Sequence, residues 1–203
     1  MNKNLQHASL SIRSDHLFKL IRSERFLRTE GLGNEVPFFI CPYKAVDAIE
    51  MEKLEKQLVN RLSQHGVQVL QVNLYDLVHD IMEREGDWDW YGKNEPTREK
   101  EDLKTDLQSI LDVENVIVPE IAQRMTAAQW DVLFINGIGE VFPYIRSHNV
   151  LNNLQKEAKD RPTVMFFPGE YTHSLEKGTS LDLFGRLRDD KYYRAFNIYE
   201  CEV

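Results

Sequence analysis

The chain has 203 residues, of which 42% are hydrophobic and 29% charged, and its formal net charge is −8. This composition is typical of a folded globular chain and excludes an intrinsically disordered one. An acidic chain also lacks the overall basic surface that wrapping a nucleic-acid backbone requires, so direct DNA binding is not expected. No run approaches the ~20 apolar residues needed to span a membrane, and polar residues interrupt the apolar runs near the N-terminus.

The cysteines and the distribution of charge say more about organisation. Only Cys41 and Cys201 are present, and Cys41 lies in an apolar run, so we expect a buried free thiol in a cytoplasmic protein. Residues 1–29 carry six Lys or Arg against two Asp or Glu, whereas residues 87–120 carry ten acids against four bases. Because no Gly/Ser/Pro-rich linker divides the chain, we predict one α/β domain over residues 1–203, with residues 1–30 as a basic N-terminal helical arm.

The first half of the chain alternates between apolar runs and helical spacing. We predict a helix from about Ser14, as N-cap, to Arg28, and a helix over 45–65 with an apolar stripe of Leu54, Leu58 and Leu62 that Val46 and Ile49 extend. The polar and aromatic stretch 86–98 reads as an exposed loop or lid. The remaining elements expected here are strands over 36–41 and 67–72 and helices over 74–85 and 97–112.

The second half contains the clearest strand, 132–135, followed by a helix with Leu151 and Leu154 on one face. Pro119 marks a break or the first turn of a short helix. We further predict a strand over 163–167 that ends at Pro168, a short helix near 180–188 and a last strand over 196–199. Strands that alternate with helices and read as continuous apolar runs predict a three-layer α/β sandwich with a mostly parallel sheet of about five strands.

Ligands of open α/β sheets bind outside the carboxyl ends of the strands, which directs attention to three loops. These loops carry the candidate pocket residues Lys44, Gly137, Gly139, Glu140, Arg146, His148, Glu170 and His173. Glu140 and Glu170 could act as a general acid and base if they converge, although capping a helix or pairing with an Arg is the simpler reading of each.

The layout of strands and helices is P-loop-NTPase-like or Rossmann-like, but the phosphate-binding loop is missing. The turn where a G-x-x-x-x-G-K-[ST] loop would lie reads Cys41 to Val46, contains no glycine, and loses one backbone N–H at Pro42. Asn136 stands where a Walker B Asp would hold Mg²⁺. The Gly137-Ile138-Gly139 stretch lacks the third glycine of a dinucleotide fingerprint, so we interpret it as a tight turn that needs glycine dihedrals.

Metal and nucleophile motifs are also missing. His79 with Glu83, and Glu170 with His173, lack the further ligands that zinc requires. There is no G-x-S-x-G elbow, and an apolar setting would raise the pKa of Cys41 and make it inert. We therefore predict no cofactor and no metal, and favour a protein that is not an enzyme.

Two segments are candidates for contact with other proteins. Trp88, Trp90 and Tyr91 lie beside acids on the stretch 86–98, a composition common in protein contact surfaces. The alternative is a lid folded onto its own domain, with the tryptophans in the core. The basic residues Arg22, Arg25 and Arg28 raise the same two alternatives, a docking arm or a covering helix.

The second half of the chain also carries a family resemblance. Residues 132–154 read VLFINGIGEVFPYIRSHNVLNNL, residues 162–171 read PTVMFFPGEY, and Leu183 to Leu187 and Tyr192 to Phe196 follow. These residues resemble the BrxB family of bacteriophage exclusion (BREX) defence systems. The resemblance covers essentially the whole chain. The resemblance implies a core component of phage defence with no assigned catalytic activity. It further implies work with PglZ, of the alkaline-phosphatase superfamily, and with the large BREX ATPase as a second candidate partner.

Three hypotheses follow. The first is a non-catalytic adaptor for other BREX proteins, chiefly PglZ. The second is a nucleotide-sensing or hydrolytic subunit that uses the residues at the strand ends; convergence of those residues in one open pocket would favour it. The third, DNA binding through the basic arm, requires a strong salt dependence of any affinity. The sequence leaves open whether the protein forms a homodimer.

Overall fold

The computed structural model describes residues 5–31, 36–174, 178–189 and 195–203. Its α-helices are α1 (Leu10–Ile21), α2 (Glu24–Leu27), α3 (Ala48–Gln64), α4 (Leu74–Glu85), α5 (Trp88–Asn94), α6 (Lys100–Ile110), α7 (Val118–Ala127) and α8 (Ser147–Leu154). Shorter helical turns are η1 (Leu5–His7), η2 (Ala45–Asp47), η3 (Glu95–Thr97), the π-helical η4 (Val113–Ile117) and η5 (Ile198–Glu200). The strands are β1 (Phe38–Tyr43), β2 (Val69–Asn73), β3 (Val132–Asn136), β4 (Thr163–Ser174), β5 (Gly178–Leu183), β6 (Leu187–Asp189) and β7 (Phe196–Asn197).

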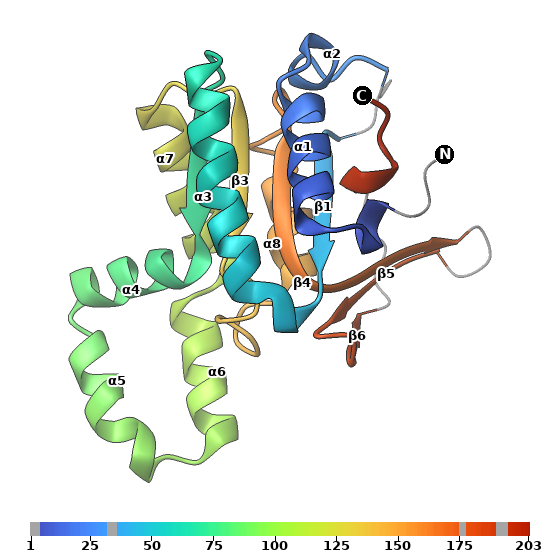
Figure 1. Cartoon of the computed structure of the whole chain (residues 1–203). Helices are drawn as coiled ribbons and strands as arrows, with labels where there is room; N and C mark the ends of the chain where they lie inside the picture. Colours follow the sequence, from blue (N-terminus) through green and yellow to red (C-terminus); the bar gives the residue numbers. More distant parts are fainter. Residues whose placement is uncertain (1–4, 32–35, 175–177, 190–194) are drawn as a thin grey trace.

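Five of these strands form a parallel sheet in the order β2-β3-β4-β1-β7. The strands β5 and β6 continue it as an antiparallel ribbon on the far end of β4, which projects from the body of the protein (Figure 1). In the Rossmann order 3-2-1-4-5-6 the first two strands are neighbours, whereas here β3 and β4 separate β1 from β2. The strand order therefore differs from that of the Rossmann fold.

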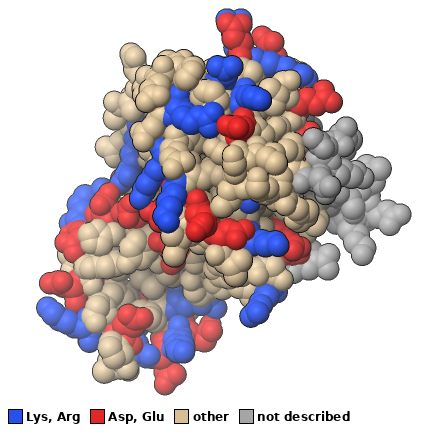
Figure 2. Space-filling model, viewed as in Figure 1, with Lys and Arg blue, Asp and Glu red and all other residues tan. Residues whose placement is uncertain are grey.

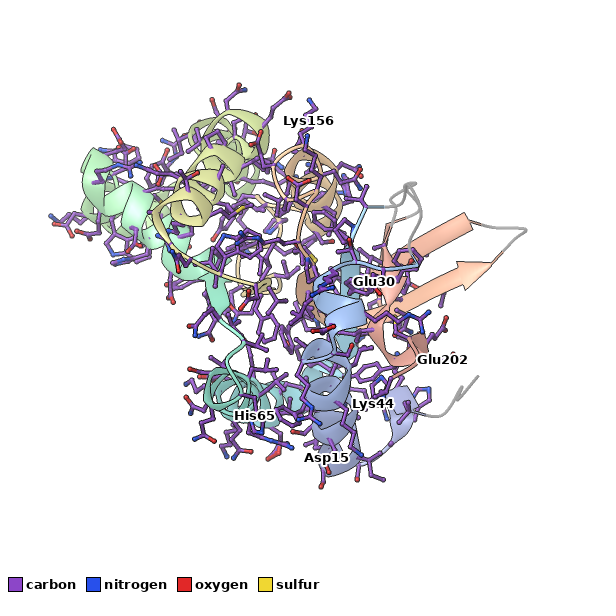
Figure 3. All side chains as sticks on the ribbon, turned by 90° about the horizontal axis from the view of Figure 1, so that it is seen from above. Asp15, Glu30, Lys44, His65, Lys156 and Glu202 are labelled. Atoms are coloured by element: carbon purple, nitrogen blue, oxygen red, sulfur yellow. The ribbon has the colours of Figure 1, made fainter. Side chains whose placement is uncertain are left out.

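Alternating side chains of each strand enter two separate cores, which confirms the predicted three-layer sandwich. Phe39, Cys41 and Phe134 face the layer of α1, α2 and α3. Phe38 and Ile40 face the opposite layer, which contains α4, α7 and α8. Figure 3 shows the layers from above, with Asp15 and His65 on one side of the sheet and Lys156 on the other.

The N-terminal segment forms two helices where one was predicted. Ser9, and not Ser14, caps α1 by accepting the backbone N–H of Ile12. Ser23 then accepts the N–H of Phe26 and begins α2, so the predicted helix is interrupted at a second capping serine. Leu17 and Ile21 are fully buried against α3 and the sheet, so α1 covers the sheet.

Other differences from the sequence-based elements have clear physical causes. The stretch 86–98 contains α5 and η3 and is not a loop, and no α5 side chain is fully buried. Residues 178–189 form strands β5 and β6, not a helix, because Phe184 and Gly185 have positive φ angles of 56° and 68° that make a tight turn. Strand β4 does not end at Pro168 but runs on to pair with β5.

The apolar stripe predicted on the helix over 45–65 is correct only in part. Leu54, Leu58 and Leu62 are buried. Val46 and Ile49 do not extend the stripe, since they are 88% and 68% exposed. Residues 45–47 form the separate turn η2, which contains Val46, and the buried face of α3 begins only at Met51, after Ile49.

Candidate functional site

Two cavities lie at the carboxyl edge of the parallel strands, where the sequence placed a candidate pocket. The larger, which we call the acidic cavity, has a volume of about 580 Å³ and lies between α3, the start of α4 and the ends of β1, β2 and β3. Its lining includes Tyr43, Glu55, Asn73, Asn136, Gly137 and Glu140. In Figure 2, acidic side chains gather across the middle of this face, around the lower end of α3.

Glu55 is the most unusual residue of the acidic cavity. It lies on the buried face of α3, only 5% exposed, and accepts a hydrogen bond of 2.7 Å from the Asn136 side-chain amide. Burial raises the pKa of Glu55 to about 7 from an ordinary value of 4.5, against the opposing effect of that hydrogen bond. The buried Oδ1 of Asn136 has no hydrogen-bond partner among the described residues. Glu55 and Asn136 thus place a buried carboxyl group beside an amide oxygen that accepts no hydrogen bond from the described residues.

The glycine turn after β3 fits tightly against the end of β2. Asn73 and Asn136 are register partners at the ends of these strands. Asn73 caps α4 through hydrogen bonds from the N–H groups of Tyr75 and Asp76. Gly137 has φ = 74°, and a Cβ there would lie 2.5 Å from the Asn73 Oδ1, so the prediction that this turn needs glycine is confirmed at Gly137.

The second cavity, about 300 Å³, is separate and lies beside the turn that follows β1. We call it the Lys44 pocket, and its lining includes Lys44, Glu170, Phe184 and, shared with the acidic cavity, Tyr43. A Cβ at Gly139 would lie 2.9 Å from the ring of Phe184, so this glycine allows the β3 loop to approach the β5–β6 turn closely.

The predicted pocket residues are therefore divided. Gly137 and Glu140 line the acidic cavity, and Lys44 and Glu170 line the Lys44 pocket. Arg146 is exposed before α8 and lines neither, while His148 is buried on α8 and has partners within the protein. The His173 backbone is part of β4, but its side chain lies outside the described residues.

The end of β1, where the chain of a P-loop protein would enter its phosphate loop, is held by buried side chains. Arg13 of α1 is 3% exposed and donates to the Pro42 carbonyl at 3.2 Å and to the Tyr199 hydroxyl at 2.9 Å. Cys41 lies 3.2 Å from the same hydroxyl, and burial raises the pKa of its thiol to about 11. Cys41 is thus the buried free thiol predicted from sequence.

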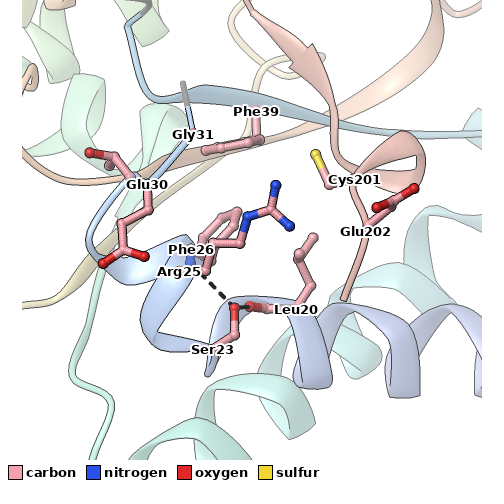
Figure 4. Close-up of a pocket in the computed structure, with 10 residues that line it drawn as sticks. Leu20, Ser23, Arg25, Phe26, Glu30, Gly31, Phe39, Cys201 and Glu202 are labelled. Atoms are coloured by element: carbon pink, nitrogen blue, oxygen red, sulfur yellow. Dashed lines mark hydrogen bonds between the residues drawn. The ribbon is translucent and has the colours of Figure 1, made fainter. Parts of the chain in front are cut away.

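The two candidate partner surfaces lie at opposite ends of the molecule (Figure 1). Near α2, Arg22, Arg25 and Arg28 are exposed, and Figure 4 shows Arg25 extending into a pocket of about 140 Å³ that Phe39 and Cys201 also line. On α5, Trp88 and Tyr91 pack against the core, whereas Trp90 is 46% exposed with Arg98 stacked 5.5 Å from its ring. The aromatic cluster is thus divided between core and surface.

Within the described ranges, no three His, Cys, Asp or Glu side chains come together as a metal site. None of the helices described has the length and apolar character that crossing a membrane would need.

Sequence reasoning missed Glu55 and Asp76 of the acidic cavity. For Glu55 a signal was present, because Met51, Leu54, Leu58 and Leu62 define a buried stripe and Glu55 falls within it. A carboxylate at such a position is rarely buried without a reason. Asp76 lies one helical turn after β2 and gave no such signal.

The fold and the edge of its sheet define a class: a three-layer α/β protein with a mostly parallel sheet, an acidic cavity at the strand ends and no phosphate loop. The family model of the BREX protein BrxB matches residues 70–198. A BREX protein BrxB of Bacillus cereus (strain H3081.97) is 32% identical over 198 residues, covering 93% of this chain and 96% of the relative. Another BREX protein BrxB, of Escherichia coli O9:H4 (strain HS), is 28% identical over 190 residues, covering 93% of this chain and 91% of the relative. The chain belongs to the BrxB family, which is part of BREX phage-defence systems. No solved structure matches it.

Proposed function

We propose that this chain is a non-catalytic core component of a BREX system that acts as an adaptor, binding other BREX proteins, chiefly PglZ. The observation that carries the proposal is the chemistry of the strand ends. In a P-loop NTPase this edge presents backbone N–H groups and a lysine to phosphate. Here the acidic cavity presents Glu55 and Glu140, which disfavour phosphate, and Pro42 at the end of β1 lacks a backbone N–H. The one lysine of the turn that follows, Lys44, lines the separate pocket and has no glycine beside it in the sequence.

The arrangement of the other candidate residues argues against the nucleotide-sensing or hydrolytic alternative. General acid–base catalysis needs its groups within reach of one substrate. Glu140 and Glu170 line different cavities, and His148 is buried on α8 with partners in the protein. The residues that an enzyme would need together are therefore apart.

Two separated surfaces suit an adaptor. The basic surface of Arg22, Arg25 and Arg28 near α2 and the exposed Trp90 on α5 are too far apart to serve one small contact. A chain with two such surfaces can contact two partners, for which PglZ and the large BREX ATPase are the candidates. Exposed aromatic and Arg side chains are enriched among residues that dominate binding energy at interfaces.

The test is co-purification of the full chain with the PglZ of its operon, followed by size-exclusion chromatography with light scattering. We expect one heteromeric peak. Trp90→Ala and an Arg22→Glu/Arg25→Glu pair are then compared with Lys156→Glu, an exposed control that follows α8 and belongs to neither surface. Loss of the complex in either surface variant, but not in the control, would identify the contact. Two separate peaks for the unmodified proteins would overturn the partner proposal.

A further inference from the structure

The acidic cavity holds negative charge that the protein itself leaves uncompensated. Two bases of the described chain line the cavity, but both are already engaged, Lys56 with Glu52 at 2.6 Å and Arg124 with Asp80 at 2.6 Å. In the part of the chain that the structure describes, Glu55, Asp76 and Glu140 form no ion pair. The cavity therefore favours a cation and disfavours phosphate.

The deepest groups in the cavity are acceptors. Glu55 uses one oxygen for the Asn136 amide, and no described residue donates a hydrogen bond to its other oxygen. The Asn136 Oδ1 is buried and likewise receives no hydrogen bond from the residues described. A buried carboxylate oxygen without a donor is unfavourable, and a ligand in the cavity that carries N–H groups would donate to the free oxygen of Glu55. A guanidinium group has five such donors in a planar fork, and an ammonium group has three.

A metal ion fits this arrangement less well than an organic cation. No three carboxylate, His or Cys side chains among the described residues are close enough to hold a metal. The cavity volume, about 580 Å³, also exceeds the space that a single ion occupies and is large enough for a side chain with its stem.

The rim of the cavity indicates that the cation belongs to a protein segment. Ile49, in the first turn of α3, lines the cavity and is 68% exposed. Val46, in the preceding turn η2, lines the neighbouring Lys44 pocket and is 88% exposed. Neither contributes to the core, although the helical spacing predicted both there. Exposed aliphatic side chains beside a charged pocket are typical of the core and rim of a protein–protein contact.

We propose that the acidic cavity receives an arginine or lysine side chain from a partner protein, while Val46 and Ile49 contact apolar residues on either side of it. The inference rests on the proposed adaptor function and specifies the chemistry of one of its contacts. Glu55, Asp76 and Glu140 supply the charge, and the second carboxylate oxygen of Glu55 supplies the acceptor.

The first arm of the test uses N-acetyl-arginine amide as the probe and follows the side-chain amide signals of Asn136 by NMR in the full chain. We expect saturable shifts with the arginine probe and none with N-acetyl-glutamine amide. A Glu55→Gln/Glu140→Gln variant should weaken binding of the probe at least tenfold. The glutamine introduced on α3 keeps an oxygen acceptor for the Asn136 amide, so the variant is expected to fold. The control, Glu114→Gln/Glu157→Gln, removes the same charge from exposed positions on the other layer.

The second arm measures the affinity of the same variants for purified PglZ. The Glu55→Gln/Glu140→Gln pair should weaken the complex tenfold or more, and the control pair should not. A Val46→Ser variant, which leaves the lining of the acidic cavity intact, should weaken the PglZ complex but leave binding of the arginine probe unchanged, which separates a protein segment from a free small cation.

The outcomes separate this inference from the function on which it rests. If PglZ binds but neither the probe nor the charge-removed variant shows any effect, the cavity inference is overturned and the adaptor function stands. If the probe binds as expected but no PglZ complex forms, the proposed partner is wrong and the cation site stands. Asn136 signals that move equally in wild type and the charge-removed variant would overturn the site itself.

Discussion

Two helices on the same side of the sheet each bury a charged side chain, and the two sites differ in how fully their hydrogen bonds are made. Arg13 of α1 donates to the Pro42 carbonyl and the Tyr199 hydroxyl and stacks 5.0 Å from the Tyr199 ring. Glu55 of α3 accepts one hydrogen bond, from an asparagine whose own oxygen is unpartnered among the described residues. A buried polar group with its partners supports the fold, whereas one without them indicates a place for a ligand.

The largest effect expected is on the Arg13 site. Arg13→Ala removes two hydrogen bonds and the packing of a long side chain, and it leaves the Pro42 carbonyl without its donor. We expect a loss of about 3 kcal/mol in the free energy of unfolding, measured by urea titration. Arg28→Ala, which removes an exposed ion pair with Glu24, should cost less than about 1 kcal/mol. Equal losses would remove the distinction between the two arginines.

The Glu55 site should respond in the opposite direction. Because burial raises the pKa of Glu55 to about 7 in the folded protein, above its ordinary value of 4.5, the folded state binds the proton more tightly than the unfolded state. The contribution of Glu55 to the free energy of unfolding is most favourable below pH 4.5 and is lost as the pH rises through about 7. Glu55→Gln should therefore stabilise the protein by about 2 kcal/mol at about pH 8 and change little at about pH 5.

The measurement is the free energy of unfolding by urea at both pH values. The Glu114→Gln variant, exposed on the other layer, serves as the control and should show no such difference between the two pH values. A Glu55→Gln variant that is less stable than wild type at the higher pH would mean that the ionised carboxylate stabilises the fold and is not held ready for a ligand.

A smaller effect tests whether the Arg13 site acts as a unit. Tyr199→Phe removes the hydroxyl that accepts from Arg13 and lies 3.2 Å from the Cys41 sulfur. We expect a loss of about 1.5 kcal/mol, because the Arg13 Nε is left buried without an acceptor. The double variant Arg13→Ala/Tyr199→Phe should lose less than the sum of the single variants, and the difference measures the coupling. Strict additivity would contradict a shared site.

The same comparison explains how much the sequence could predict. Strands β1 to β4 and helices α3 and α4 follow from apolar runs and periodic stripes, and the missing phosphate loop follows from Pro42 and the absence of glycine. Periodicity could not predict which residue each polar side chain pairs with. Arg13 pairs with Tyr199 across 186 residues, and Glu55 pairs with Asn136 across 81. Such contacts depend on strand order, which local pattern does not contain.

The elements predicted wrongly share a physical cause, since each is a place where a single turn or cap overrides the pattern around it. Ser23 begins a second helix inside a periodic stripe, and Phe184 and Gly185 turn a stretch read as helix into a hairpin. The turn η2 likewise interrupts the helix predicted over 45–65 near its start. Val46 and Ile49, which the pattern had placed in the core, are exposed there, Ile49 at the acidic cavity and Val46 at the neighbouring Lys44 pocket.

The smallest expected effect follows from that last difference. If Val46 and Ile49 serve a contact and not the fold, Val46→Ser/Ile49→Ser should change the free energy of unfolding by less than about 0.5 kcal/mol, as surface substitutions do. Leu58→Ser, on the same helix but fully buried, should cost several times more, because it leaves a cavity and a buried hydroxyl. Urea titration of the three proteins measures this directly. A large loss for the exposed pair would mean that both residues stabilise the fold. The proposed apolar contacts beside the acidic cavity would then have no support.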